Sequence, residues 1–149
     1  IAEVLKNSNV DGVYGDLEYV NKENTNNIIR HWKSKNFHPK LLKQGWMPAH
    51  PTLFLKREVY LKHGNFDLSY KIAADYDFML RVLKDQSLKF SYIPEVITKM
   101  RVGGASNRSL KNIIQKTKED YRAIRSNNIG DWFSILIKNI SKIKQFISK

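Results

Sequence analysis

The first strong pattern in the chain is an alternation of apolar and polar residues over 10–20, which predicts a β-strand. A polar turn over 21–27 and a second apolar stretch over 28–33 predict that the strand returns as a hairpin. One face of the first strand would carry Val13, Leu17 and Tyr19, and the other Tyr14 and Glu18. Shorter apolar runs predict strands at 51–55, 88–93 and 96–102, with Pro94 between the last two.

Helical spacing of apolar residues, or the residues that typically end helices, marks the rest of the chain. The predicted helices cover 1–7, 38–44 (a short helix or a loop), 56–62 (ending before Gly64), 75–84, 109–126 and 131–149, with a loop over 65–73. Short strands mixed with helices indicate an α/β or α+β fold. We expect one mixed sheet flanked by helices, with further helices at the C-terminal end.

Composition narrows the class of protein. The 149 residues suit one domain, and 42% hydrophobic with 27% charged residues is typical of a globular chain with a real core. The absence of cysteine excludes disulfides, cysteine-ligated metals and a thiol nucleophile. No apolar run reaches the roughly 18 to 20 residues that span a bilayer. The first residues lack Met and read like the middle of a helix, so we expect a piece of a longer protein.

The net charge of +12 favours an anionic partner of some kind. Seven of these excess positive charges lie from Arg108 onward, away from the most motif-like stretch. A non-catalytic basic module for nucleic acid or an anionic membrane surface is therefore the alternative to an enzyme. However, no recognition motif for DNA or RNA is evident, so we expect no nucleic-acid partner.

The strongest candidate for chemistry is the start of the helix over 75–84, where Asp75 and Asp77 flank Tyr76. An aspartate in a first turn often caps the helix, and this explanation covers either residue. Alternatively, one carboxylate is a general base beside the small residues Ala73 and Ala74. The two side chains diverge around the helix, so both do not face one metal ion easily. Arg81 is expected to brace the helix.

Two loops offer further candidates. Trp46 and His50 lie between prolines in the stretch 45–52, which is either a packed loop or one that contacts a ligand through an aromatic face and a donor. After the strand over 96–102, Gly103 and Gly104 would let the backbone approach a phosphate beside Arg101, although a plain strand-to-helix turn is the default.

Taken together, these segments resemble the C-terminal half of a bacterial family-2 glycosyltransferase with the GT-A fold. The resemblance runs from about Val10 to Ser126 and rests on the order and spacing of five segments: 13–16, 47–54, 64–67, 72–81 and 101–106. It implies an inverting transfer of sugar from a nucleotide-sugar donor to a glycan or lipid-linked acceptor, in surface polysaccharide synthesis. Asp75 matches the catalytic base, with Asp77 and Arg81 in support. The residues implied to bind substrate are Trp46, His50, Asp16, Arg101, Gly103 and Gly104.

The family's N-terminal half would precede Ile1. It carries the nucleotide pocket and the Asp-x-Asp motif for a divalent metal (Mg²⁺ or Mn²⁺), so the complete enzyme is expected to use a metal that no motif in this chain would hold. We expect residues 1–107 to be the acceptor-side part of the catalytic domain and the fragment alone to be inactive. Without the missing half, an apolar sheet edge or face would be exposed or covered by a second copy in a homodimer.

Residues 131–149 form a basic, amphipathic pattern at the end of a C-terminal helical segment, 108–149. Phe133, Leu136 and Ile140 follow helical spacing, while Lys138 falls elsewhere. The helix either packs on its own domain or lies on an anionic membrane. The predicted location is the cytoplasm, with peripheral contact at the inner face of the membrane.

Overall fold

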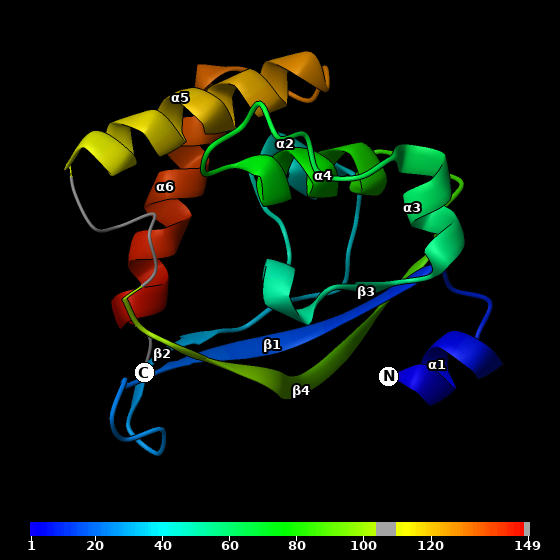
Figure 1. Ribbon diagram of the computed structural model, residues 1–149, viewed down its shortest axis with the longest axis horizontal. Coiled ribbons are helices and arrows are strands. Elements are labelled where there is room, and N and C mark those ends of the chain that lie inside the picture. Colours follow the sequence, from blue (N-terminus) through cyan, green and yellow to red (C-terminus); the bar gives the residue numbers. More distant parts are fainter. Residues whose placement is uncertain (104–109, 148–149) are drawn as a thin grey trace.

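The computed structural model describes residues 1–103 and 110–147. Its centre is a mixed, open sheet of four strands (Figure 1). The central strand β1 (Gly12–Val20) pairs antiparallel with β2 (Ile28–Trp32) and with β3 (Phe54–Leu55), and parallel with β4 (Phe90–Arg101). The predicted hairpin and the mixed sheet are confirmed, and the fold is α/β.

Most of the helices lie on one face of this sheet, with α6 at one end of it and α1 at the other (Figure 1). Their bounds are α1 Ala2–Asn7, α2 Lys40–Lys43, the 3-10 helix η1 His50–Thr52, α3 Arg57–His63, α4 Ala74–Leu83, α5 Leu110–Ser126 and α6 Trp132–Ile147. Figure 1 shows α2, α4 and α5 above the sheet, with η1 between α4 and β1. α6 contacts both α5 and β2. All the helices predicted from the sequence are confirmed within a residue or two at most boundaries.

The core is organised around α4, which is buried on nearly all sides. One side packs with α5 and α6 in a cluster that includes Tyr76, Met79, Leu80, Leu83, Ala123, Ile124 and Ile135. The other side places Phe78 and Val82 against Val59 of α3. Because the first cluster joins α4 to both C-terminal helices, residues before and after position 107 contribute to one core. α4 is therefore a fixed platform for any side chain on its first turn.

Two strand predictions were wrong in extent. The run 51–55 is mostly η1, and only its last two residues pair with β1. The Thr52 hydroxyl lies 2.8 Å from the Ala49 carbonyl, which closes this turn locally. The runs 88–93 and 96–102 form one strand, because Pro94 occupies a register shift between Tyr92 and Val96. A proline fits such a position, since it has no N–H to donate to a ladder.

Candidate functional site

Glu119 of α5 anchors the backbone that leads into α4. The Glu119 carboxylate accepts hydrogen bonds from the backbone N–H groups of Lys71, Ile72 and Ala73, at 3.1, 2.8 and 2.9 Å. Gln115, one turn earlier on α5, donates to the same carboxylate. Burial opposes the charge of Glu119, but these hydrogen bonds outweigh it and lower its pKa to about 2. Of the two aspartates considered for capping α4, Asp75 accepts a first-turn N–H, that of Tyr76, at 2.7 Å.

The hydrogen bonds to the Glu119 carboxylate predict that the stability of the fold depends on pH. The pKa of Glu119 falls from an ordinary 4.5 to about 2 on folding, so its contribution is complete above pH 4.5 and lost as the pH falls toward 2. That contribution is about 3 kcal/mol at pH 7. Glu119→Gln should lower the free energy of urea unfolding by about 2 to 3 kcal/mol at pH 7, and the difference should shrink steadily below pH 4.5. The exposed variant Glu23→Gln is the control, and an equal loss at every pH would contradict the account.

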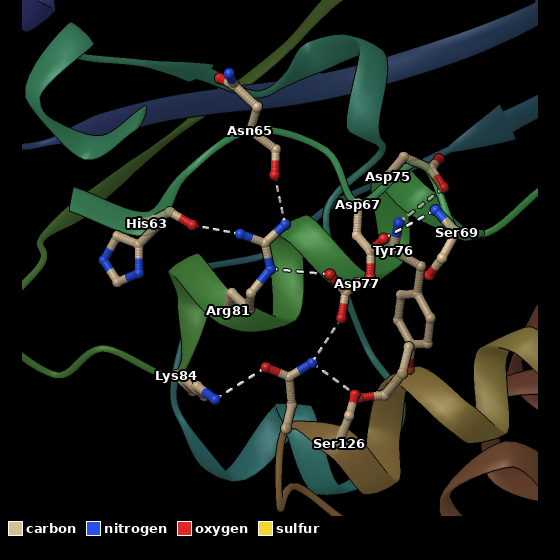
Figure 2. Close-up of polar contacts among 12 residues, drawn as sticks. His63, Asn65, Asp67, Ser69, Asp75, Tyr76, Asp77, Arg81, Lys84 and Ser126 are labelled. Carbon is tan, nitrogen blue, oxygen red and sulfur yellow. Dashed lines mark hydrogen bonds and ion pairs between the residues drawn. The ribbon is translucent and has the colours of Figure 1, made fainter. Parts of the chain in front are cut away.

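Asp77 is committed to structure. Its carboxylate, 5% exposed, accepts hydrogen bonds from Arg81 Nε at 2.9 Å and from Asn127 Nδ2 at 3.0 Å (Figure 2). Arg81 also donates to the carbonyl oxygens of His63 and Asn65, so it ties α4 to the loop that follows α3. Arg81 therefore holds the bracing position expected for it. Both carboxylate oxygens of Asp77 are therefore bonded to other residues of the protein.

Asp75 differs from Asp77 in its surroundings. It is half-buried, and within the described parts of the chain its carboxylate accepts one hydrogen bond, from the adjacent Tyr76 N–H at 2.7 Å. Figure 2 shows the Asp75 carboxylate pointing away from Asp77 and Arg81. Burial raises the pKa of Tyr19 and the charge of Asp75 raises it further, against the effect of Arg30. Asp75 is thus within electrostatic reach of Tyr19, near the C-terminal end of β1.

Other candidates lie at the same end of the sheet. In the parallel ladder, Arg101 at the end of β4 is opposite Val20 at the end of β1, and its side chain is exposed. Gly103 follows with φ +108°, and a Cβ built on it would meet nothing within 4 Å. Gly104 lies outside the described residues. In open α/β sheets, ligands bind beyond the carboxyl ends of parallel strands, so this end is the candidate functional site.

Sequence reasoning missed Arg30 at this end of the sheet. Its guanidinium lies 5.2 Å from the ring centre of Tyr19 and 5.1 Å from that of Trp32. Burial lowers the pKa of Arg30, and Tyr19 opposes that effect. The alternation of Arg30 and Trp32 along β2, opposite an aromatic in β1, is the signal that could have found this cluster.

Asp16 lies further back, in the middle of β1, and is buried. Its Oδ1 accepts hydrogen bonds from the Ser34 N–H at 2.7 Å and the Tyr92 hydroxyl at 2.8 Å. His31 Nε2 of β2 lies 3.5 Å from the other carboxylate oxygen. Burial, together with the hydrogen bond and charge of Asp16, raises the pKa of Tyr92 to about 12. Asp16 thus links β1 to residues of β4 and of β2 and its following segment, which is a structural role. Its predicted contact with substrate stays a prediction.

Trp46 and His50 belong to the packing around this middle region. The Trp46 ring stacks on Phe37 at 6.1 Å and meets Tyr14 edge-on at 6.2 Å. The His50 ring meets Phe66 edge-on at 5.7 Å. Both residues are half-buried in the loop and η1 segment between α2 and β3. The structure connects Trp46 to the Asp16 cluster through Tyr14, and no described contact connects either residue to Asp75.

A hollow of about 430 Å³ lies on the Asp77 side of α4. Its lining includes Asp67, Asp77, Arg81, Arg122 and Asn127, and excludes Asp75, Trp46 and His50. Trp46, His50 and Asp75 therefore do not meet in this hollow. Its carboxylates and cations already bond within the protein, as Asp77 does with Arg81.

The Asp75–Asp77 pair does not form a metal site, because Asp77 is bonded to Arg81 and points away from Asp75. Across residues 1–103 and 110–147, no group of three or more histidines and carboxylates could hold a metal ion. Comparison with protein-family models and with curated proteins found no match to this chain.

Proposed function

We propose that this chain is the acceptor side of an inverting glycosyltransferase with a GT-A-like fold, and that Asp75 is its catalytic base. The observation that carries the proposal is the unequal use of the two aspartates in α4. Asp77 is bonded to Arg81 and Asn127, and Glu119 holds the backbone just before the helix. Asp75 is left with one local hydrogen bond on a rigid helix, as a base needs to be. The order of the five motif segments supports the family.

The proposed reaction consists of one proton transfer and one substitution at the anomeric carbon of the donor sugar. The Asp75 carboxylate accepts the proton of an acceptor hydroxyl at about 2.6 to 3.2 Å while the hydroxyl oxygen attacks the anomeric carbon. The bond from that carbon to the nucleoside diphosphate breaks on the opposite face, which inverts the configuration. The product is a new glycosidic bond, a released nucleoside diphosphate and a protonated Asp75. Because Asp75 is half-buried and accepts one hydrogen bond within the described residues, its carboxylate would still be accessible to an acceptor hydroxyl.

In this proposal the acceptor is a glycan or a lipid-linked sugar, and the donor is a nucleotide-sugar. The exposed Arg101 and the open space beside Gly103 lie at the carboxyl end of β4, where an anionic donor or product would meet them. In the complete enzyme, the donor pocket and its divalent metal would belong to the preceding half of the domain. This chain alone is then expected to lack transfer activity.

The test is the anomeric configuration of the product formed by the complete enzyme. A donor with an α-linked nucleotide should give a β-glycoside from the first turnover, observed by proton NMR. Retention of configuration would contradict the proposal. Hydrolysis of the donor without transfer to any hydroxyl acceptor would also contradict it, because the base is assigned to the acceptor.

A further inference from the structure

The outer side of α6 presents a continuous apolar surface. Its members recur at helical spacing and are about half exposed or more: Trp132, Phe133, Leu136 and Ile140. The inner side of the same helix carries Ser134, Ile135 and Lys138, all buried. Lys138 lies off the exposed apolar face, as expected, and it is buried because its ammonium pairs with buried Asp120 at 2.9 Å. The helix therefore packs on its own domain and still exposes a second apolar face.

α5 extends this surface. Leu110, Ile113 and Ile114 are exposed on the helix face that also carries Tyr121. The Tyr121 ring stacks on Trp132 at 4.6 Å, so the apolar faces of the two helices meet. Figure 1 shows α5 and α6 together at one side of the molecule, with α1 and α3 at the other. We call these exposed residues and Tyr121 the α5–α6 surface.

The exposed charges along α5 have one sign, and one acidic residue, Asp131, is exposed at the start of α6. α5 carries two acidic residues in the described range, Glu119 and Asp120, and both are turned inward. Its exposed charged residues are all basic: Lys111, Lys118, Arg122 and Arg125. By the rotation of an α-helix they lie on the flank next to the apolar face. An apolar face with tryptophan and phenylalanine beside a basic flank is the pattern of helices that lie in a membrane interface.

We propose that the α5–α6 surface binds the surface of an anionic lipid bilayer. Complementary charge favours this occupant, because the basic flank meets negative headgroups while the apolar face enters the interface. A second copy of this chain is disfavoured, since a twofold contact would bring the two basic flanks together. Within the described residues no helix is long and apolar enough to cross a membrane. The inference does not depend on sugar transfer.

Co-sedimentation with vesicles tests this inference on the 149-residue chain. Vesicles of equal parts phosphatidylglycerol and phosphatidylcholine should pellet the protein, and pure phosphatidylcholine should not. The double variant Phe133→Ser with Leu136→Ser should bind about tenfold more weakly or worse, because it removes two apolar anchors. Lys111→Glu with Lys118→Glu should weaken binding as well and reduce its dependence on salt. Point variants are preferable to deleting α6, since the deletion would also remove Ile135 and Lys138 from the core.

Matched controls carry the same chemical changes elsewhere. Leu61→Ser with Leu68→Ser replaces two exposed leucines (73% and 90% exposed) away from the α5–α6 surface and should bind like the original chain. Arg57→Glu with Lys89→Glu makes the same charge change at exposed sites outside it. Equal binding to neutral vesicles, or unchanged binding of both test variants, would overturn the proposal. A dimer in solution that Phe133→Ser with Leu136→Ser dissociates, without vesicle binding, would assign the surface to a second copy instead.

Discussion

Asp75→Asn is expected to lower kcat of the complete transferase by about 10² to 10⁴, the usual contribution of a positioned general base. Asparagine keeps the shape of the side chain and can still accept the Tyr76 N–H, but it cannot take a proton at neutral pH. The melting temperature should change little, because that single bond is the only hydrogen bond of Asp75 within the described residues. Initial rates at saturating donor and acceptor measure the effect. Near-normal turnover would remove Asp75 from the mechanism.

Asp120→Ala is expected to cost about 3 to 5 kcal/mol of stability, because it leaves buried positive charge without its partner. Asp120 is 2% exposed and accepts from Lys138, also 2% exposed, and from Lys116. Burial opposes the charge of Asp120, but the two lysines outweigh it and lower its pKa. The Lys138 ammonium also lies 3.0 Å from the ring centre of Tyr76. Urea unfolding at pH 7 measures the loss.

A second variant separates the unpaired charge from lost packing. Asp120→Ala combined with Lys138→Met removes both buried charges and should recover a large part of the stability. Lys116→Met is the milder control, since Asp120 then keeps Lys138. If Asp120→Ala costs less than about 1 kcal/mol, the pair is not the anchor between α5 and α6 that its burial indicates.

Local signals predicted the elements well. α3 ends where Gly64 adopts φ +73°, a conformation that glycine tolerates and other residues rarely adopt. The hairpin of β1 and β2 followed from the polar turn between two apolar runs. Pro94 misled the strand prediction because a proline in an isolated sequence signals a break, whereas the register shift in β4 accommodates it. The difference lies in sheet pairing, which no local window contains.

Long-range contacts could not be predicted either, because a local stretch of sequence does not show which distant segment it contacts. Glu119 bonds to the N–H of Ala73, 46 residues earlier, and nothing around either segment signals their contact. The burial of Lys138 could not be predicted either, because its partner Asp120 belongs to another helix. By contrast, helix geometry alone predicted that Asp75 and Asp77 point apart, and this is confirmed.

The roles of the candidate site residues stay predictions, but their places in the fold can be compared. Asp75, Arg101 and Gly103 lie toward one end of the β1–β4 pair. Trp46 and Asp16 lie nearer the middle of the sheet, because their positions are set by aromatic packing and strand pairing rather than by spacing in sequence.

A side-by-side rate measurement on Asp75→Asn and Asp77→Asn tests the central claim most directly. Both residues are on the first turn of α4 and differ mainly in direction. Asp77→Asn should lower the melting temperature, since it breaks the ion pair with Arg81, while each folded molecule keeps most of its turnover. Asp75→Asn should keep its melting temperature and lose about 10² to 10⁴ in kcat. Equal losses of kcat in the two variants, or a larger loss for Asp77→Asn, would contradict the assignment of Asp75 as the base.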